Sequence, residues 1–312
     1  MDEHRIFFVD YNFLTCGDIF TLGMVDAARE LNIPCEHAEW YDERLLSKIT
    51  AYDPSLIFVV HGRKFYDRWQ LKFPPWLMDR TAVWLLDEPY ETDDTQRWSG
   101  WFNTVFVNDP STVNLHRNAH YLPVAYSPSI HHPPEGGNRI HQVGFIGGWN
   151  PTREKCLLRL LQEGLLSYVI GPDWKKTPLR SVLAGENITP QEVAKWYQNT
   201  KIILNVFRDK HHWNKNNIKP YSLNPRIYEA LACRALVISE WRPEMSLTFP
   251  GVPTFTNVDE MMAQVKGMLS NDEARTRTLH LVSHEIAHHT YTNRLRRVLE
   301  AISNAHQIQA TA

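Results

Sequence analysis

The stretch NPRIYEALACRALVIS, residues 224–239, places an amphipathic helix directly before a buried strand. Pro225 fixes φ and lacks the N–H that a first helical turn leaves unpaired, so it marks the start of the helix. Apolar residues recur at helical spacing over residues 227–232. The apolar run at 235–238 has the length and composition of a strand. The stretch therefore predicts one helix–strand unit of an α/β protein.

Polar residues at the start of this helix are candidates for a nucleotide site. Arg226 and Glu229 lie three residues apart, and Asn224 lies in the loop before them. A helix N-terminus attracts phosphate, an arginine binds it, and a carboxylate can accept hydrogen bonds from ribose hydroxyls. The alternative, which the spacing alone favours, is an i,i+3 ion pair on a solvated helix face.

Size and composition indicate a protein of about two domains. The chain has 312 residues, 43% of them hydrophobic, and a formal net charge of −2, so bulk charge provides no general attraction to DNA or membrane. Its four cysteines include no C-x-x-C pair, which is typical of a reduced cytosolic protein. No apolar run approaches the ~20 residues that span a bilayer, and we expect a cytoplasmic protein without a signal peptide or membrane insertion.

Strand-like segments alternate with helical patterns along the chain, which predicts parallel βαβ units. The expected strands are 5–10, 35–40, 55–60, 82–86 and 104–107, then 142–146, 168–171, 201–206 and 235–238. A Pro- and Gly-rich segment near residue 135 has the composition of a linker. We expect an N-terminal domain at 1–134, a linker at 135–140, a second domain at 141–285, and a C-terminal helical segment at 286–312 that continues a helix begun near Asp272 and is long enough to pack back on the first domain.

Ligands of such sheets bind beyond the carboxyl ends of the strands, so the residues that follow each strand are candidates. His61 and Asp87 follow two expected strands of the first half, and Arg208 follows one of the second. Gly147-Gly148 opens the second domain between a strand and a helix, where backbone N–H groups can approach a phosphate; a plain tight turn is equally consistent. No G-x-G-x-x-G, P-loop or G-x-S-x-G motif is present.

Two further motifs have competing interpretations. Residues 208–219 interleave cations with Trp213, which suits a phosphate, a base, a sugar or nucleic acid, or else a solvated loop. His284-Glu285-Ile286-Ala287-His288 matches H-E-x-x-H, the zinc pattern of metallopeptidases. The extended peptidase pattern calls for glycine and a third histidine where this chain has Tyr291 and Arg294, so a zinc peptidase is the weaker hypothesis.

Several segments are similar to one known family. They are WLLDEPYE from Trp84, VFVND from Val105, YLPVA from Tyr121, VGFIGGW from Val143, KIILNV from Lys201, NPRIYEALAC from Asn224 and HTYTNRL from His289. In these segments, which extend over most of the chain, the protein resembles the CgeB-like, spore-maturation-type glycosyltransferases, a branch of the GT-B enzymes related to families 1 and 4.

The resemblance implies two Rossmann-like domains whose parallel sheets face each other across a cleft. A nucleoside-diphosphate sugar, UDP-sugar above all, would be held mainly by the second domain and the acceptor by the first, without metal or other cofactor. Glu229 matches the residue that holds the donor ribose, while Arg226 and Arg208 match positions suited to the diphosphate, above the glycine turn. The full expected donor site comprises Gly17, Gly147, Gly148, Arg208, Tyr221, Ser222, Asn224, Arg226 and Glu229.

Two departures leave the sugar and the stereochemistry open. Arg234 stands where the family often has glycine, and Tyr221 occupies the first position of the related Glu-x7-Glu pair. Arginines and a helix N-terminus can stabilise a leaving diphosphate electrostatically. With retention, the expected outcome, the departing phosphate can deprotonate the acceptor. With inversion a base must face it, Asp87 first and His61 second.

Asp87 also has a structural alternative, which is to cap the next helix or pair with Arg63 or Arg97. A binding module without turnover is the second hypothesis for the whole protein. The acceptor can be a glycan, a small molecule, a protein or a hydroxymethylated DNA base of a phage. A DNA acceptor requires residues 210–219 and Arg63-Lys64 to line one groove.

Overall fold

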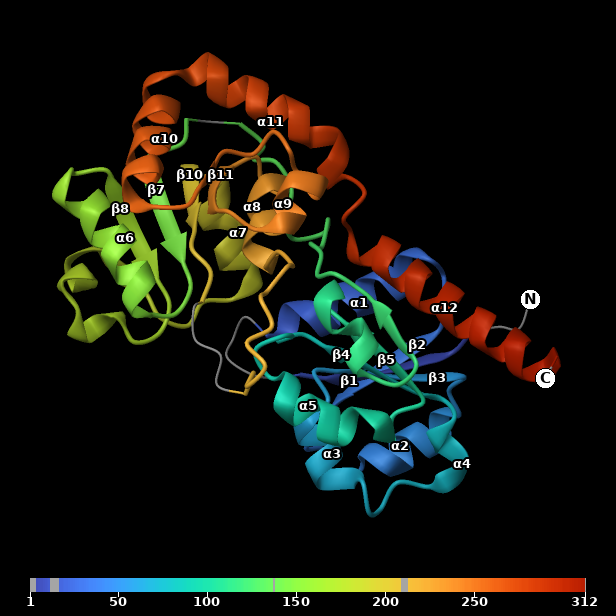
Figure 1. The fold of residues 1–312 in the computed structure, drawn as a ribbon. Coiled ribbons are helices and arrows are strands. Elements are labelled where there is room, and N and C mark those ends of the chain that lie inside the picture. Colours follow the sequence, from blue (N-terminus) through green and yellow to red (C-terminus); the bar gives the residue numbers. More distant parts are fainter. Residues whose placement is uncertain (1–3, 12–16, 137, 209–212, 312) are drawn as a thin grey trace.

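The chain forms two α/β units, each built on a six-stranded parallel sheet (Figure 1). The computed structural model describes residues 4–311 apart from 12–16, 137 and 209–212. Strand order is β2-β1-β3-β4-β5-β6 in the N-terminal unit and β12-β11-β10-β7-β8-β9 in the C-terminal unit. Every neighbouring pair is parallel. The predicted fold class, two Rossmann-like parallel sheets, is confirmed.

The first five strands of the N-terminal unit are those that the apolar runs predicted, and the sixth was not expected. Its strands are β1 (Ile6–Asp10), β2 (Cys35–Glu39), β3 (Leu56–Val60), β4 (Thr81–Leu85), β5 (Thr104–Val107) and β6 (Ala119–Tyr121). Its helices are α1 (Asp18–Glu30), α2 (Leu45–Tyr52), α3 (Arg63–Trp69), α4 (Pro75–Met78) and α5 (Thr92–Trp98), with short 3-10 turns at Ser99–Trp101 and Pro110–Leu115. β3, β4 and β5 are buried along their whole length, as expected of strands covered on both faces.

The C-terminal unit repeats the arrangement. Its strands are β7 (His141–Ile146), β8 (Leu166–Ile170), β9 (Leu183–Gly185), β10 (Thr200–Asn205), β11 (Leu236–Glu240) and β12 (Thr254–Phe255). Its helices are α6 (Pro151–Gln162), α7 (Pro190–Gln198), α8 (Pro225–Ala232), α9 (Pro243–Thr248), α10 (Val258–Ser270) and α11 (Asp272–Ile286), with 3-10 turns at Trp174–Lys176 and Pro178–Val182. Proline near the N-terminus of α6, α7, α8 and α9 marks where each helix begins.

The expected single helix from Asp272 to about Ala305 is wrong, because the chain breaks between α11 and α12 (Tyr291–Thr311). At the break, the Tyr126 N–H donates to the His289 carbonyl and the Tyr291 N–H donates to the Tyr126 carbonyl. The backbone here pairs with a distant segment instead of continuing its own helical hydrogen bonds. The break redirects α12 away from α11 and toward the N-terminal unit (Figure 1).

α12 packs against α1 of the N-terminal unit. Gly23 of α1 allows this approach, since a Cβ there would lie 2.2 Å from the Tyr291 ring. Arg294 is fully buried and donates to the carbonyls of Pro123 and Val124, at 2.8 and 3.1 Å. The C-terminal helix is therefore fixed to the first unit by packing and by a buried cation. No helix in the described part of the chain is long and apolar enough to cross a membrane.

Candidate functional site

A cavity of about 420 Å³ lies where the carboxyl ends of the two sheets meet, a volume that suits a small-molecule ligand. Its lining includes most of the predicted site residues: Gly17, Asp87, Gly147, Arg208, Ser222, Asn224, Arg226 and Glu229. His61, Gly148 and Tyr221 lie outside this lining. A larger hollow, about 940 Å³, lies along β5, β6 and α12 but contains none of these residues. We therefore take the smaller cavity, where charged groups converge, as the site.

Glu229 is buried at this cavity, with 8% of its surface exposed. It comes from the core side of α8, and Tyr197 of α7 donates its hydroxyl to Glu229 Oε2 at 3.5 Å. Burial raises the pKa of the carboxyl to about 7, although Arg226 and the Tyr197 hydrogen bond act in the opposite direction. The alternative of a solvated ion pair on the helix surface is therefore wrong.

Arg226 crosses the glycine turn at the entrance to the C-terminal unit. Its Nε donates to the Ile146 carbonyl at 2.6 Å and its Nη1 to Asn205 Oδ1 at 2.5 Å, while its guanidinium lies 4.8 Å from the Phe145 ring centroid. A Cβ at Gly147 would lie 2.4 Å from Arg226 Nη2. A side chain at 147 would have to displace the guanidinium from these two hydrogen bonds, and the positive φ of 156° also favours glycine there.

The glycine turn does not offer all its N–H groups to a ligand. The Gly147 N–H donates to the Ile170 carbonyl at 2.7 Å, and the Trp149 N–H donates to the Pro172 carbonyl at 3.1 Å. Gly171 packs on the turn so closely that a Cβ there would lie 2.3 Å from the Gly147 oxygen. The turn is therefore braced by the end of β8. The sequence alone did not indicate that Gly171 packs against this turn.

Arg208 and Asp87 join the two units across the cavity. Arg208 follows β10, Asp87 follows β4, and Arg208 Nη2 lies 2.6 Å from Asp87 Oδ1. The Arg208 guanidinium also lies 4.2 Å from the Tyr90 ring centroid. The suggested ion pair between Asp87 and Arg63 does not form, because Arg63 forms ion pairs with Asp67 and Asp94.

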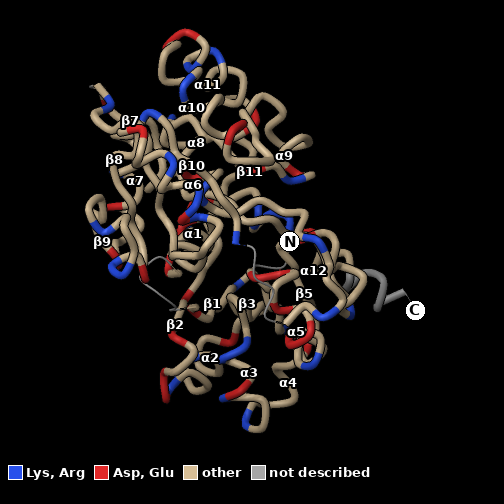
Figure 2. The backbone as a smooth tube through the Cα atoms, turned by 60° about the vertical axis from the view of Figure 1, so that its left-hand side comes forward, with Lys and Arg blue, Asp and Glu red and all other residues tan. Residues whose placement is uncertain are grey.

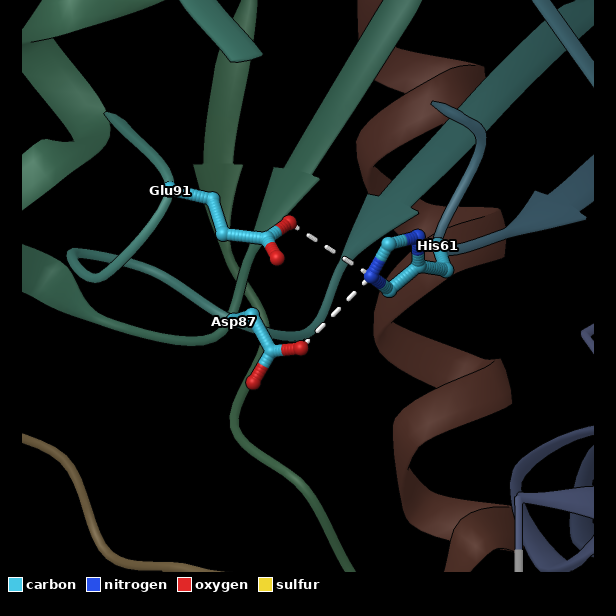
Figure 3. A group of neighbouring side chains, drawn as sticks. All are labelled: His61, Asp87 and Glu91. Atoms are coloured by element: carbon cyan, nitrogen blue, oxygen red, sulfur yellow. Dashed lines mark ion pairs between the residues drawn. The ribbon is translucent and has the colours of Figure 1, made fainter. Parts of the chain in front are cut away.

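Beside this ion pair, His61 faces two carboxylates (Figure 3). His61 Nε2 lies 3.5 Å from Asp87 Oδ2 and 3.6 Å from Glu91 Oε2. Burial would raise the pKa of Asp87, but His61 and Arg208 outweigh it, so the pKa is lowered. Burial and the Asp87 charge raise the pKa of Glu91. Glu91 is missing from the sequence-based site; its place in the quoted WLLDEPYE segment is the signal that could have found it.

Tyr221 and Ser222 hold the units together. Both backbone N–H groups and the Ser222 hydroxyl donate to Asp109 Oδ2, at 2.7, 3.0 and 3.0 Å. Arg242, which follows β11, donates to the Ser222 carbonyl at 2.8 Å and also binds the Tyr90 hydroxyl. Asp109 and Arg242 were not among the predicted site residues, although both follow strands, where ligands of such sheets bind.

The basic segment at 208–219 is only partly described, because residues 209–212 lie outside the described chain. Its remaining part docks on the N-terminal unit through backbone N–H groups. That of Trp213 donates to the Tyr90 carbonyl, that of Asp93 donates to the Trp213 carbonyl, and that of Lys215 donates to Asp93 Oδ2. Half of Trp213 remains exposed. Figure 2 shows Lys and Arg interspersed with Asp and Glu along both units. The segment connects the units, and its role toward DNA stays a prediction.

The H-E-x-x-H pattern does not assemble a metal centre in the described part of the chain. His284 lies on α11 with its side chain 82% exposed, and His288 lies beyond the end of that helix. The one described group of three candidate ligands is His61, Asp87 and Glu91, far from this pattern in the sequence. The zinc peptidase hypothesis gains no support.

Comparison with known proteins shows which family and which solved structures this chain is similar to. Residues 153–300 match the model of the glycosyl transferase-like family. An alpha-glucosyltransferase in complex with UDP and a 13-mer DNA containing a central A:G mismatch superposes with a TM-score of 0.69, at 10% identity, over 96% of this chain and 100% of that one. The fold is GT-B. The predicted enzyme class, a glycosyltransferase of EC 2.4, is confirmed by the match over residues 153–300 together with the fold.

Two further solved structures agree with this fold. The alpha,alpha-trehalose 6-phosphate synthase from Burkholderia multivorans has a TM-score of 0.58 at 9% identity, covering 99% of this chain and 98% of its own. The trehalose-6-phosphate synthase OtsA has a TM-score of 0.61 at 10% identity, covering 96% and 99%. No curated protein matches the chain. None of these matches names the CgeB-like branch, which stays a prediction.

Proposed function

We propose that this GT-B protein transfers a sugar from a nucleoside-diphosphate sugar, with UDP-sugar the first donor to test, to an acceptor hydroxyl in the cavity between the two units. The observation that carries the proposal is the buried carboxylate of Glu229 beside Arg226 and Arg208 in one cavity of ligand size. A carboxylate for ribose hydroxyls and cations for a diphosphate are the groups that a nucleotide needs. The similar alpha-glucosyltransferase in complex with UDP supports the choice of nucleotide.

The donor would lie along the N-terminus of α8. Pro225 and Arg226 of its first turn line the cavity, so the positive end of the helix faces the bound diphosphate. Arg226 is held by Ile146 and Asn205 and supplies a fixed charge. Arg208 is half-exposed and would share its guanidinium between Asp87 and a phosphate. With these groups in place, we propose that donor binding needs no metal ion.

We propose transfer with retention of configuration. Asp87, the first candidate for an inverting base, is paired with Arg208 through Oδ1, and despite burial its pKa is lowered by His61 and Arg208, so it is a weak base for an acceptor hydroxyl. In a retaining transfer the C–O bond between the anomeric carbon and the diphosphate breaks, the departing phosphate oxygen takes the acceptor proton, and the acceptor oxygen bonds to the same face of the sugar. The arginines stabilise the charge that develops on the phosphate.

We place the acceptor against the N-terminal unit, beside Asp87 and His61. A hydroxymethylated DNA base is one candidate, supported by the similar alpha-glucosyltransferase that was solved with DNA. A glycan, a small molecule and a protein hydroxyl are the others. DNA binding would depend on Lys215 and Lys219 and weaken steeply with salt, because phosphate contacts release counterions.

The test is nucleotide binding followed by turnover. Thermal unfolding would be recorded with UDP, GDP, TDP, ADP and CDP, with and without EDTA, for the wild type, Glu229→Ala and the exposed control Glu163→Ala. A ligand at 100 times its Kd adds about 2.7 kcal/mol to the free energy of unfolding, which raises Tm by several degrees. We expect one nucleotide to do so in the wild type and control, but not in Glu229→Ala relative to its own ligand-free Tm.

A stabilising nucleotide whose sugar derivative is neither transferred nor slowly hydrolysed would indicate a binding module without turnover. Stabilisation by none of the five nucleotides would overturn the proposal.

A further inference from the structure

We propose that His61, Asp87 and Glu91 form a binding site for one divalent cation of the Mn²⁺ or Zn²⁺ type on the acceptor side of the cavity. The three side chains come from the carboxyl ends of β3 and β4 and from the turn before α5 (Figure 3). One ligand atom from each lies within 4.8 Å of the others. The site deepens the proposed transferase function, on which its role rests, and is separate from the metal-free donor site.

The spacing fits a shared ion better than direct hydrogen bonds. His61 Nε2 is 3.5 Å from Asp87 Oδ2 and 3.6 Å from Glu91 Oε2. A good N–H···O bond is about 2.9 Å long. Two ligand atoms that each bind Zn²⁺ at ~2.1 Å in tetrahedral geometry lie ~3.4 Å apart. Imidazole nitrogen with carboxylate oxygens is a donor set that Zn²⁺ and Mn²⁺ accept, whereas Mg²⁺ prefers oxygen alone.

The surroundings hold two of the ligands in place. The His61 ring stacks on Tyr11 with centroids 4.2 Å apart and planes 1° from parallel. His61 also has a left-handed backbone, φ 65°, an uncommon conformation for a non-glycine residue and one that clusters at functional sites. Arg208 binds Asp87 through Oδ1, which leaves Oδ2 turned toward His61. Such outer contacts orient metal ligands.

Access and charge also fit a cation. Asp87 lines the cavity, and the side chains of Asp87 and Glu91 are 35% and 24% exposed, so an ion can reach both carboxylates from solvent, whereas His61 is 11% exposed. Two carboxylates so close together repel each other, and a divalent ion between them would remove that repulsion. Three protein ligands leave a coordination position open, as in catalytic rather than structural sites. An acceptor hydroxyl bound there would be held beside the donor sugar.

Mn²⁺ binding to the intact, EDTA-treated protein tests the site without any nucleotide. The free Mn²⁺ electron paramagnetic resonance signal would be titrated for the wild type, His61→Asn and Glu91→Gln, and histidine nitrogen coordination would be read from the electron spin-echo modulation of the bound ion. Competition with Zn²⁺ ranks the two metals. The matched control is His37→Asn, which removes a histidine of β2 whose Nδ1 lies 2.9 Å from Asp10 Oδ2 of β1.

We expect one bound ion per chain with a nitrogen signature, at least tenfold weaker binding in both site variants, and no change in the control. Circular dichroism and UDP binding confirm that each variant is folded. An absence of Mn²⁺ and Zn²⁺ binding at millimolar concentration, or binding that both variants retain, overturns the cation site and leaves a metal-free histidine between two carboxylates. If the wild type binds no metal but is still stabilised by UDP, the proposed donor site stands. If the wild type binds the metal but no nucleotide, the result counts against the transferase and leaves the cation site standing.

Discussion

Glu229 should make the stability of the protein depend on pH in a range where glutamate normally has no effect. Its carboxyl is buried among α7 and α8, and burial raises the pKa from 4.5 to about 7. Between those values the folded protein binds a proton that the unfolded chain has lost. The contribution of this group to stability is therefore largest at low pH, falls as the pH rises from 4.5 through 7, and is constant above that.

The size of the effect follows from the two pKa values. In the folded protein roughly nine-tenths of the Glu229 carboxyl is protonated at pH 6 and roughly one-tenth at pH 8, while the unfolded chain is ionised throughout. Raising the pH from 6 to 8 should therefore cost about 1 kcal/mol of the free energy of unfolding. Glu229→Gln, which keeps the shape and cannot ionise, should lose this dependence.

The assay is urea unfolding at pH 6, 7 and 8 for the wild type and Glu229→Gln. His131 and His289 have pKa values lowered to about 3 by burial, so they contribute stability above about pH 6.5 that is lost at lower pH. They do so in both proteins, and only the difference between the two curves reports Glu229. Glu163→Gln, an exposed pair with Lys266, should leave the wild-type slope unchanged. Equal pH slopes in the wild type and Glu229→Gln would refute the reasoning.

Two substitutions test the packing around the site. Gly147→Ala should lower the free energy of unfolding by about 1–3 kcal/mol and weaken UDP binding at least tenfold. The reason is that its Cβ would displace the Arg226 guanidinium and that a backbone at φ 156° is unfavourable for alanine. Calorimetry measures the UDP Kd and the Tm, and an unchanged UDP affinity would contradict the prediction. Arg294→Met should cost roughly 2 kcal/mol, since buried carbonyls at 123–124 lose their donor. Urea unfolding measures the loss, and Arg296→Met, an exposed residue of the same helix, should cost little.

Much of the fold followed from local patterns. The apolar runs at 55–60 and 82–86 became strands buried on both faces, and Pro225 began α8 as its chemistry requires. The three-residue β6 and β9 and the two-residue β12 were missed, because edge strands this short are too brief to show a hydrophobic run. The break before α12 was missed as well, since hydrogen bonds to Tyr126 produce it.

Some residues of the candidate site were predicted from the sequence, and others were found only in the structure. The rule that ligands bind where parallel strands end selected His61, Asp87 and Arg208, which the structure brings together. Glu91 joins them only because the turn after β4 folds back beside His61.

The sequence by itself determined the helix–strand alternation and the parallel sheets, because both depend on the periodicity of apolar residues within short segments. It also determined which polar residues lie at strand ends. Only the tertiary structure decided whether Glu229 is solvated or buried, and that Tyr221 and Ser222 bind Asp109 of the opposite unit. Burial and partnership between residues more than a hundred positions apart depend on how the two sheets dock, and no local pattern contains that information.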